Sequence, residues 1–259
     1  ATRLALLEAG VTTMTELAGR TAPVEGIDDT ALTALRSQAG LQLTEPTPED
    51  PLPYEVHDPA ALAALPPPSE GDVFFDFEGD PLWRGATPTD QGLEYLFGSL
   101  TATGEFVPFW AHDREQERAA LVGFVGWLRE RLERWPDLHV FHYSPYERTA
   151  LTRLAARHGV LRDDVAQILD SGVFVDLYAV VKAGVRVGSS SYSIKRLEPL
   201  YMGDEVRTAD VQKGDDSIVQ YVAARQHAAA GDRVEAERLL DDLADYNRYD
   251  CVSTRRLRN

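Results

Sequence analysis

One short stretch constrains the fold more than any other part of this chain. Residues 73–80 read Val-Phe-Phe-Asp-Phe-Glu-Gly-Asp. Side chains of a strand alternate between its two faces, so Asp76 and Glu78 share one face while Phe75 and Phe77 point into a core. Two adjacent carboxylates beside an apolar run repel each other and lose hydration unless a positive charge lies between them. The stretch therefore predicts either a site for a hard divalent cation such as Mg²⁺ or Mn²⁺, or a strand end whose acids face solvent.

Composition limits the class of protein. The chain has 259 residues, of which 44% are hydrophobic, enough for one large domain with or without a small appendage. No apolar run is long enough to span a membrane. The single cysteine, Cys251, excludes an internal disulfide framework and favours a reducing, cytoplasmic location. A net charge of −16 argues against a broad electrostatic surface for nucleic acid, although a metal site would bring its own positive charge.

Three regions differ in composition. Residues 1–42 hold two helix–turn–helix patterns with glycine in the turns, which predicts a helix-hairpin-helix-like segment. Its turn amides either bind phosphate or simply close a small helical packing unit. Residues 43–70 contain eight of the 15 prolines and predict an extended linker, interrupted by a short helix over 59–65. Residues 71–259 form the third region. Because the sequence starts with Ala and ends inside a helical pattern, we expect a segment of a longer protein.

The third region alternates strands and helices. Strands are expected over 73–78, 93–100 and 105–111, the last two joined by a hairpin turn. A long amphipathic helix with Leu121, Phe124 and Leu128 on one face follows, and Pro136 ends it. Next come a strand over 138–141, a helix over 145–158, an extended piece over 172–175 and a helix over 176–183. The remainder is helical, with breaks near Gly203 and Gly214. This order predicts an α/β fold, an RNase H-like mixed sheet flanked by helices.

Further acidic residues lie at the ends of these elements. Glu147 falls in the first turn of a helix, where an acid either complements the helix dipole or reaches a site. Tyr246 and Asp250 lie one turn apart on the apolar stripe of the last helix, so Asp250 needs a partner, whether a cation or a nearby arginine. Asp176 is most simply a helix N-cap.

Taken together, Asp76, Glu78, Glu147, Tyr246 and Asp250 resemble the motifs of the DEDD exonuclease superfamily in its tyrosine-bearing subclass. The order of the motifs, the Asp-x-Glu on the first strand and the Tyr-x-x-x-Asp on the last helix all agree, over roughly residues 72–256. The resemblance implies a 3′–5′ exonuclease with two Mg²⁺ or Mn²⁺ ions held by the four carboxylates. It implies that Tyr246 orients the attacking water, and it places Asp176 and His142 in the surroundings of the metal ligands.

A narrower resemblance rests on residues 75–81 and 191–201, together with the preceding helical hairpin segment. These look like the middle region of bacterial RecB-like nuclease–helicase fusion proteins. The resemblance implies that a RecB-like nuclease domain and a helicase domain flank this segment in the full-length protein. One departure stands out, because the second motif of the superfamily usually has Asn four residues before Asp, and the chain has Tyr143 and Glu147.

Substrate contacts are expected in the most basic, hydroxyl-rich stretch of this acidic chain. Lys195 and Arg196 follow a run of serines and could hold phosphates, while Tyr192 could stack a base. The alternative is an exposed loop followed by a capped helix. Trp83 either stacks near the 3′ end of the strand or belongs to the core. His142 and His158 are expected to be structural, since oxygen donors suit these metals better.

Two functions from different classes remain. The first is a metal-dependent 3′–5′ exonuclease on single-stranded nucleic acid, with DNA favoured and RNA possible, which releases nucleoside 5′-monophosphates. The second is a catalytically silent RNase H-like module that binds nucleic acid or braces neighbouring domains. The intact Asp76, Glu78, Tyr246 and Asp250 favour the first, whereas Glu147 and the net charge favour the second.

Overall fold

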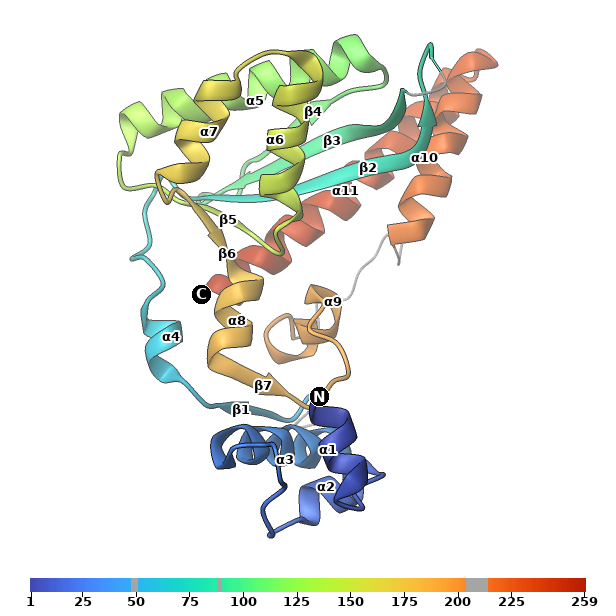
Figure 1. The fold of residues 1–259 in the computed structure, drawn as a ribbon. Coiled ribbons are helices and arrows are strands. Elements are labelled where there is room, and N and C mark those ends of the chain that lie inside the picture. The colour runs from blue at the N-terminus through green and yellow to red at the C-terminus, as the bar shows by residue number, and fades with distance from the viewer. Residues whose placement is uncertain (48–50, 88–89, 204–213) are drawn as a thin grey trace. The chain divides into compact units, whose positions relative to one another are not determined.

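The computed structural model describes residues 1–47, 51–87, 90–203 and 214–259. Within these the chain forms two compact units (Figure 1). The first comprises Ala1–Leu65 and Tyr178–Gly203, and the second comprises Pro66–Leu177 and Asp204–Asn259. Each unit is described by itself below. The domain boundaries expected from composition stay a prediction.

The first unit is built from short elements: α1 Thr2–Glu8, α2 Met14–Gly19, α3 Asp29–Leu43, β1 Tyr54–Val56, α4 Pro59–Ala63, most of α8 Leu177–Gly184, β7 Val185–Val187, α9 Ile194–Leu197 and the 3₁₀ turn Glu198–Leu200. Thr13 and Glu16 form a reciprocal capping box at the start of α2. Gly10 precedes it with a φ of 77°, a left-handed conformation that glycine adopts without strain. The predicted short helix near Pro59 is confirmed, whereas the antiparallel pair β1–β7 was not predicted.

The second unit is centred on a five-stranded sheet of order β4-β3-β2-β5-β6. Its strands are β2 Val73–Arg84, β3 Gln91–Thr101, β4 Phe106–Trp110, β5 Val140–His142 and β6 Phe174–Asp176. The first three run antiparallel, and β5 and β6 add parallel pairings beside β2. The predicted α/β fold with a mixed sheet is therefore confirmed.

Helices cover both faces of this sheet (Figure 1). They are α5 Arg114–Arg134, α6 Tyr146–His158, α7 Arg162–Asp170, α10 Gly214–Ala229 and α11 Arg233–Arg258. On one face Phe75 stacks on Phe124 of α5, with ring centroids 4.5 Å apart. On the other face Asn247 of α11 reaches Asp76. Helix α5 ends at Arg134, two residues before Pro136, which agrees with the predicted end of this helix. Helix α7 was not predicted.

Two apolar clusters hold the sheet and helices together. The larger one packs Phe75, Phe77 and Phe97 against α5 and α6, and each of these rings is less than a tenth exposed. The smaller one joins the far end of the hairpin β2–β3 to α10 and α11 through Trp83, Tyr95 and Tyr221. This distribution confirms that Phe75 and Phe77 of β2 face a core, on the side opposite to Asp76 and Glu78.

Strand β2 extends to Arg84, past the predicted end at Glu78, and its pairing is irregular beyond that residue. The register with β3 shifts between Glu78 and Gly79 and again between Asp80 and Arg84, so Pro81 falls where ladder pairing is interrupted. None of the described helices is both long and apolar enough to cross a membrane.

Candidate metal site

Three carboxylates meet on the face of β2 that looks toward α11. One oxygen from each of Asp76, Glu78 and Asp250 lies within 4.8 Å of the others. Glu78 and Asp250 are 8% and 9% exposed, and Asp76 is half-buried. Three like charges at this spacing with little water around them are costly unless a cation neutralises them. The group could therefore hold a metal ion, and its oxygen donors are those that Mg²⁺ and Mn²⁺ prefer.

Local sequence explains why these acids converge. Phe75 and Phe77 enter the larger core, and strand alternation turns Asp76 and Glu78 to the opposite side. On α11 the buried positions Leu243, Tyr246, Asn247 and Asp250 recur at helical spacing, so packing of this stripe on the sheet carries Asp250 to β2. Burial of apolar neighbours thus positions the carboxylates.

Asn247 holds the carboxylate of Asp76 in place. Its side chain is fully buried, and its Nδ2 donates to Asp76 Oδ2 at 2.9 Å. Asp76 pairs with Gly98 across the sheet, and a Cβ at Gly98 would collide with Asn247 Oδ1. The absence of a side chain at Gly98 lets α11 approach closely enough for this hydrogen bond.

Glu78 is held by hydroxyl groups. Its Oε2 accepts from Ser217 Oγ of α10 at 3.0 Å and from Tyr95 of β3 at 3.4 Å. Tyr221 stacks on Tyr95 with ring centroids 3.8 Å apart. Burial, followed by the charge of Glu78, raises the pKa of Tyr95 far above its usual value, so this phenol stays protonated and donates.

Glu147 lies at the start of α6 and is 3% exposed, but it is not part of the three-carboxylate group. Its Oε2 lies 3.2 Å from Nδ1 of the fully buried His142. That Nδ1 also lies 2.7 Å from the carbonyl oxygen of Ser144, which accepts, so Nδ1 carries the proton. Burial raises the pKa of Glu147, and the contact with His142 opposes this shift. His142 therefore positions Glu147, and its role in the surroundings of a metal site stays a prediction.

Asp176 is the last residue of β6 and accepts a hydrogen bond from the backbone N–H of Ser144 at 2.9 Å. Ser144 has a φ of 109°, an unusual value for a residue with a side chain. Asp176 thus stabilises the turn between β5 and α6 that presents Glu147.

Cys251 directly follows Asp250 on α11 and is fully buried. Asp76, Asp250, Glu78 and Glu147 all act on the fully buried thiol of Cys251, whose pKa is raised first by burial and then by their charges. Since a thiol of raised pKa is a weak ligand, Cys251 is a packing residue.

The remaining predicted residues divide between the two units. Tyr246 is 3% exposed within the cluster that also buries Trp83, which is 7% exposed. The structure therefore places Trp83 in the core, the second of its two expected positions. Tyr192, Lys195 and Arg196 belong to the first unit, where the Tyr192 hydroxyl donates to the carbonyl oxygen of Val185 at 3.2 Å. Their roles toward a substrate stay predictions, as does that of Tyr246.

Sequence reasoning missed three residues that contact the acids: Asn247, Tyr95 and Ser217. Helical spacing could have found Asn247, because it lies three residues before Asp250 on the stripe already identified. Nothing in the sequence points to Ser217, which is 139 residues from the carboxylate it contacts.

One of three comparisons with known proteins found a match. Searches of curated proteins and of solved structures found no significant match. Residues 73–259 match the model of the family described as RNase_H superfamily, which spans the whole sheet, Glu147 and the three-carboxylate group. This chain therefore belongs to the RNase H superfamily and carries a nucleic-acid-processing domain of that family.

Proposed function

We propose that this chain is a metal-dependent 3′–5′ exonuclease that hydrolyses single-stranded nucleic acid to nucleoside 5′-monophosphates, and DNA is the substrate to test first. The observation that carries the proposal is the group of Asp76, Glu78 and Asp250 within 4.8 Å. Its donors are all hard oxygens, and Asn247 and Ser217 donate hydrogen bonds to two of the carboxylates.

Two Mg²⁺ or Mn²⁺ ions are proposed, as in other two-metal nucleases. A bound divalent ion supplies Lewis-acid chemistry, since it lowers the pKa of a water and stabilises charge on the leaving oxygen. Asp76, Glu78 and Asp250 would hold one ion, and Glu147 with Asp76 would hold the other. Asn247 and His142 would fix the orientation of Asp76 and Glu147, as outer residues of metal sites commonly do.

Tyr246 is proposed to orient the attacking water through its hydroxyl. Its place one helical turn before Asp250, on the buried side of α11, supports this role. A free phenol has a pKa near 10 and keeps its proton at neutral pH, so it cannot act as the base. Positioning of the water is therefore the role proposed for Tyr246.

Flanking RecB-like nuclease and helicase domains in the full-length protein belong to the same proposal. Within such a protein the chain would trim single strands that a helicase exposes. The basic stretch with Tyr192, Lys195 and Arg196 is proposed to contact the strand.

A second candidate function is favoured by one observation. Glu147 is paired with His142 and stands outside the three-carboxylate group, so the ligand set for a second ion is incomplete as it stands. A catalytically silent module that binds nucleic acid or braces neighbouring domains fits this arrangement.

Digestion of 5′-labelled single-stranded DNA and RNA in Mn²⁺ separates the two. The exonuclease gives a ladder that shortens from the 3′ end and that a 3′-terminal block prevents. Asp76→Asn keeps the shape of the side chain but removes its charge, and should abolish the ladder. Intact substrate with the folded wild-type protein would leave the silent module as the function, and cleavage by Asp76→Asn would point to a contaminant.

A further inference from the structure

A pocket of about 390 Å³ opens in the second unit between the end of β2, the start of β3 and α6. Its walls include Gly79, Glu94, Tyr146, Arg153 and Arg157. Gly79 directly follows Glu78, and Tyr146 directly precedes Glu147, so the pocket adjoins two of the proposed metal ligands along the chain. Its volume is in the range of small-molecule sites.

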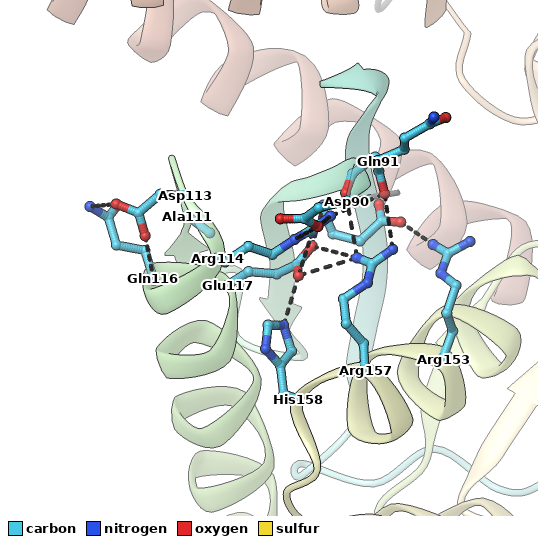
Figure 2. Close-up of polar contacts among 12 residues, drawn as sticks. Asp90, Gln91, Ala111, Asp113, Arg114, Gln116, Glu117, Arg153, Arg157 and His158 are labelled. Carbon is cyan, nitrogen blue, oxygen red and sulfur yellow. Dashed lines mark hydrogen bonds and ion pairs between the residues drawn. The ribbon is translucent and has the colours of Figure 1, made fainter. Parts of the chain in front are cut away.

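The pocket carries two guanidinium groups with different freedom. Arg157 is fixed, because its Nη1 lies 3.1 and 3.2 Å from the two oxygens of the fully buried Glu117, and its Nη2 donates to the carbonyl oxygen of Gln91 (Figure 2). Arg153 lies one turn earlier on α6, and its side chain is 44% exposed. An anchored and an exposed arginine on one helix face suit an anionic ligand.

In the structure Glu94 forms an ion pair with the exposed Arg153. Its Oε1 accepts from Arg153 and, at 2.7 Å, from the hydroxyl of Tyr146. Its Oε2 is buried with no hydrogen-bond partner among the described residues, and burial raises the pKa of this carboxyl. Glu94 is thus an incompletely satisfied internal anion that stands where an oxygen of a ligand phosphate could stand.

Tyr146 offers an aromatic ring for stacking in the same pocket. It is 44% exposed although its ring packs edge-on against Phe77, with centroids 6.4 Å apart. The Arg153 guanidinium lies 5.8 Å from the centre of the same ring. An exposed aromatic face beside a cationic group is the combination that stacks a base and holds its phosphate.

One edge of β2 between the carboxylates and the pocket has no β-strand partner among the described residues. On the side of β5, β2 is paired only at Val73 and Phe74, and none of the described strands pairs with β2 beyond that point on this side. The edge of β2 next to Asp76 and Glu78 therefore leads, without a covering strand, to Gly79 and the pocket.

We propose that this pocket binds one nucleotide unit of a single strand, with its phosphate on Arg153 and its base against Tyr146. The identity of the ligand rests on the proposed nuclease function. Binding displaces Glu94 from Arg153, so the ion pair seen in the structure competes with the substrate.

The test compares the two partners of this ion pair by anisotropy of a 5′-fluorescein short oligo(dT), in EDTA so that no cleavage occurs. Arg153→Gln should weaken binding about tenfold, since one charge-assisted phosphate contact is lost. Between about 20 and about 150 mM NaCl, the slope of log Kd against log salt should fall by about 0.7 for one phosphate contact on a single strand. Glu94→Gln should tighten binding, because it frees Arg153.

Opposite signs for the two variants are the decisive result, because a merely structural ion pair would shift both in the same direction. Arg129→Gln is the matched control, since Arg129 forms an ion pair with Asp164 at 2.6 Å on an exposed part of α5. It should change neither the affinity nor the slope. Thermal unfolding confirms that each variant is folded.

Tyr146→Phe should keep the affinity, and Tyr146→Leu should lower it, because only the leucine removes the aromatic face. Competition by free thymidine 5′-monophosphate shows whether the pocket takes a released nucleotide as well as a strand. Changes of equal sign in Arg153→Gln and Glu94→Gln, or no oligo(dT) binding by the wild type, overturn the proposal. Asp76→Asn, which tests the nuclease itself, should retain this metal-free binding, so the two failures are distinguishable.

Discussion

At the scale of single residues, Asn247 is the neutral donor that holds Asp76 in place. Its amide stands 2.9 Å from Asp76 Oδ2 and is fully buried. Because such outer contacts orient the ligand, Asn247→Ala should lower Mn²⁺ affinity about 10- to 100-fold, measured by isothermal titration calorimetry. Asp241→Ala, an exposed change on the same helix, should leave the affinity unchanged. Equal affinities for the wild type and Asn247→Ala would show that the amide serves packing alone.

The burial of Glu147 leads to a prediction about how the stability of the chain depends on pH. Burial raises its pKa above 4.5, so the folded state disfavours the ionised form. Stability therefore carries a penalty above the raised pKa, and the penalty is relieved as pH falls through that pKa toward 4.5. In EDTA, Glu147→Gln should be more stable than the wild type at pH 8, because the amide buries no charge. The difference should shrink as pH falls.

Chemical denaturation over a pH series measures this difference. Glu115→Gln is the control, since Glu115 also lies in the first turn of a helix but is exposed. The wild type and Glu115→Gln should keep a constant difference over the same pH range. A gap between wild type and Glu147→Gln that grows toward acid pH would contradict the assigned direction.

The acids themselves could be predicted because each one obeys a local rule. Asp76 and Glu78 follow strand alternation, and Asp250 follows the apolar stripe of its helix. Helical spacing also places Asn247 on that stripe, but its contact with Asp76 and that of Ser217 with Glu78 could not be predicted, because they span 171 and 139 positions of sequence. Contacts of that range are set by how β2, α10 and α11 pack, which periodicity within one element does not contain.

At the scale of elements, long periodic segments were predictable, as were the short strands β5 and β6 and the short helix α4, whereas β1 and β7 were not. Helix α5 and the strands β2 and β3 are long enough to show the periodic pattern of apolar residues that identifies a helix or a strand. Strands β1 and β7 have three residues each and exist through their pairing with one another. The extension of β2 past Glu78 was missed because Gly79 and Pro81 are typical of a turn, whereas here they mark irregular pairing.

The approach of β3 to α11 depends on Gly98. A methyl group there would overlap the Asn247 amide and also lie 3.2 Å from the ring of Phe106. Gly98→Ala should therefore push the two elements apart, at a cost of about 1–3 kcal/mol for overpacking, and should weaken Mn²⁺ binding together with stability. Denaturant unfolding and calorimetry measure the two effects.

Gly126→Ala provides the comparison. Gly126 lies on an exposed part of α5 with no atom within 4 Å of an added Cβ. The same substitution should stabilise the chain there by about 0.5–1 kcal/mol, because alanine favours a helix interior. If Gly98→Ala behaved like Gly126→Ala, the close packing assigned to Gly98 would be wrong.

At the scale of the whole molecule, the net charge of −16 opposes the binding of a polyanion such as nucleic acid. Such a chain repels nucleic acid at long range, so positive charge has to be concentrated locally. A divalent cation among Asp76, Glu78 and Asp250 would supply part of it, and Arg153 and Arg157 of the pocket would add to it. We therefore expect nucleic-acid affinity to depend on metal as well as on salt.

A metal ion held by the same three carboxylates would couple metal binding to folding. A ligand that binds only the native state stabilises it by mass action, about 2.7 kcal/mol at a concentration 100 times its Kd. For a chain of this size each kcal/mol corresponds to about 2–4 °C, so saturating Mn²⁺ should raise the Tm by roughly 5–10 °C. Asp250→Asn removes one of the three charges and should abolish most of the shift. Because this acidic chain also attracts cations loosely, the scan is repeated at matched ionic strength with NaCl, which should not reproduce the shift. An equal shift in Asp250→Asn would mean that Mn²⁺ acts on the general negative charge and not at this site.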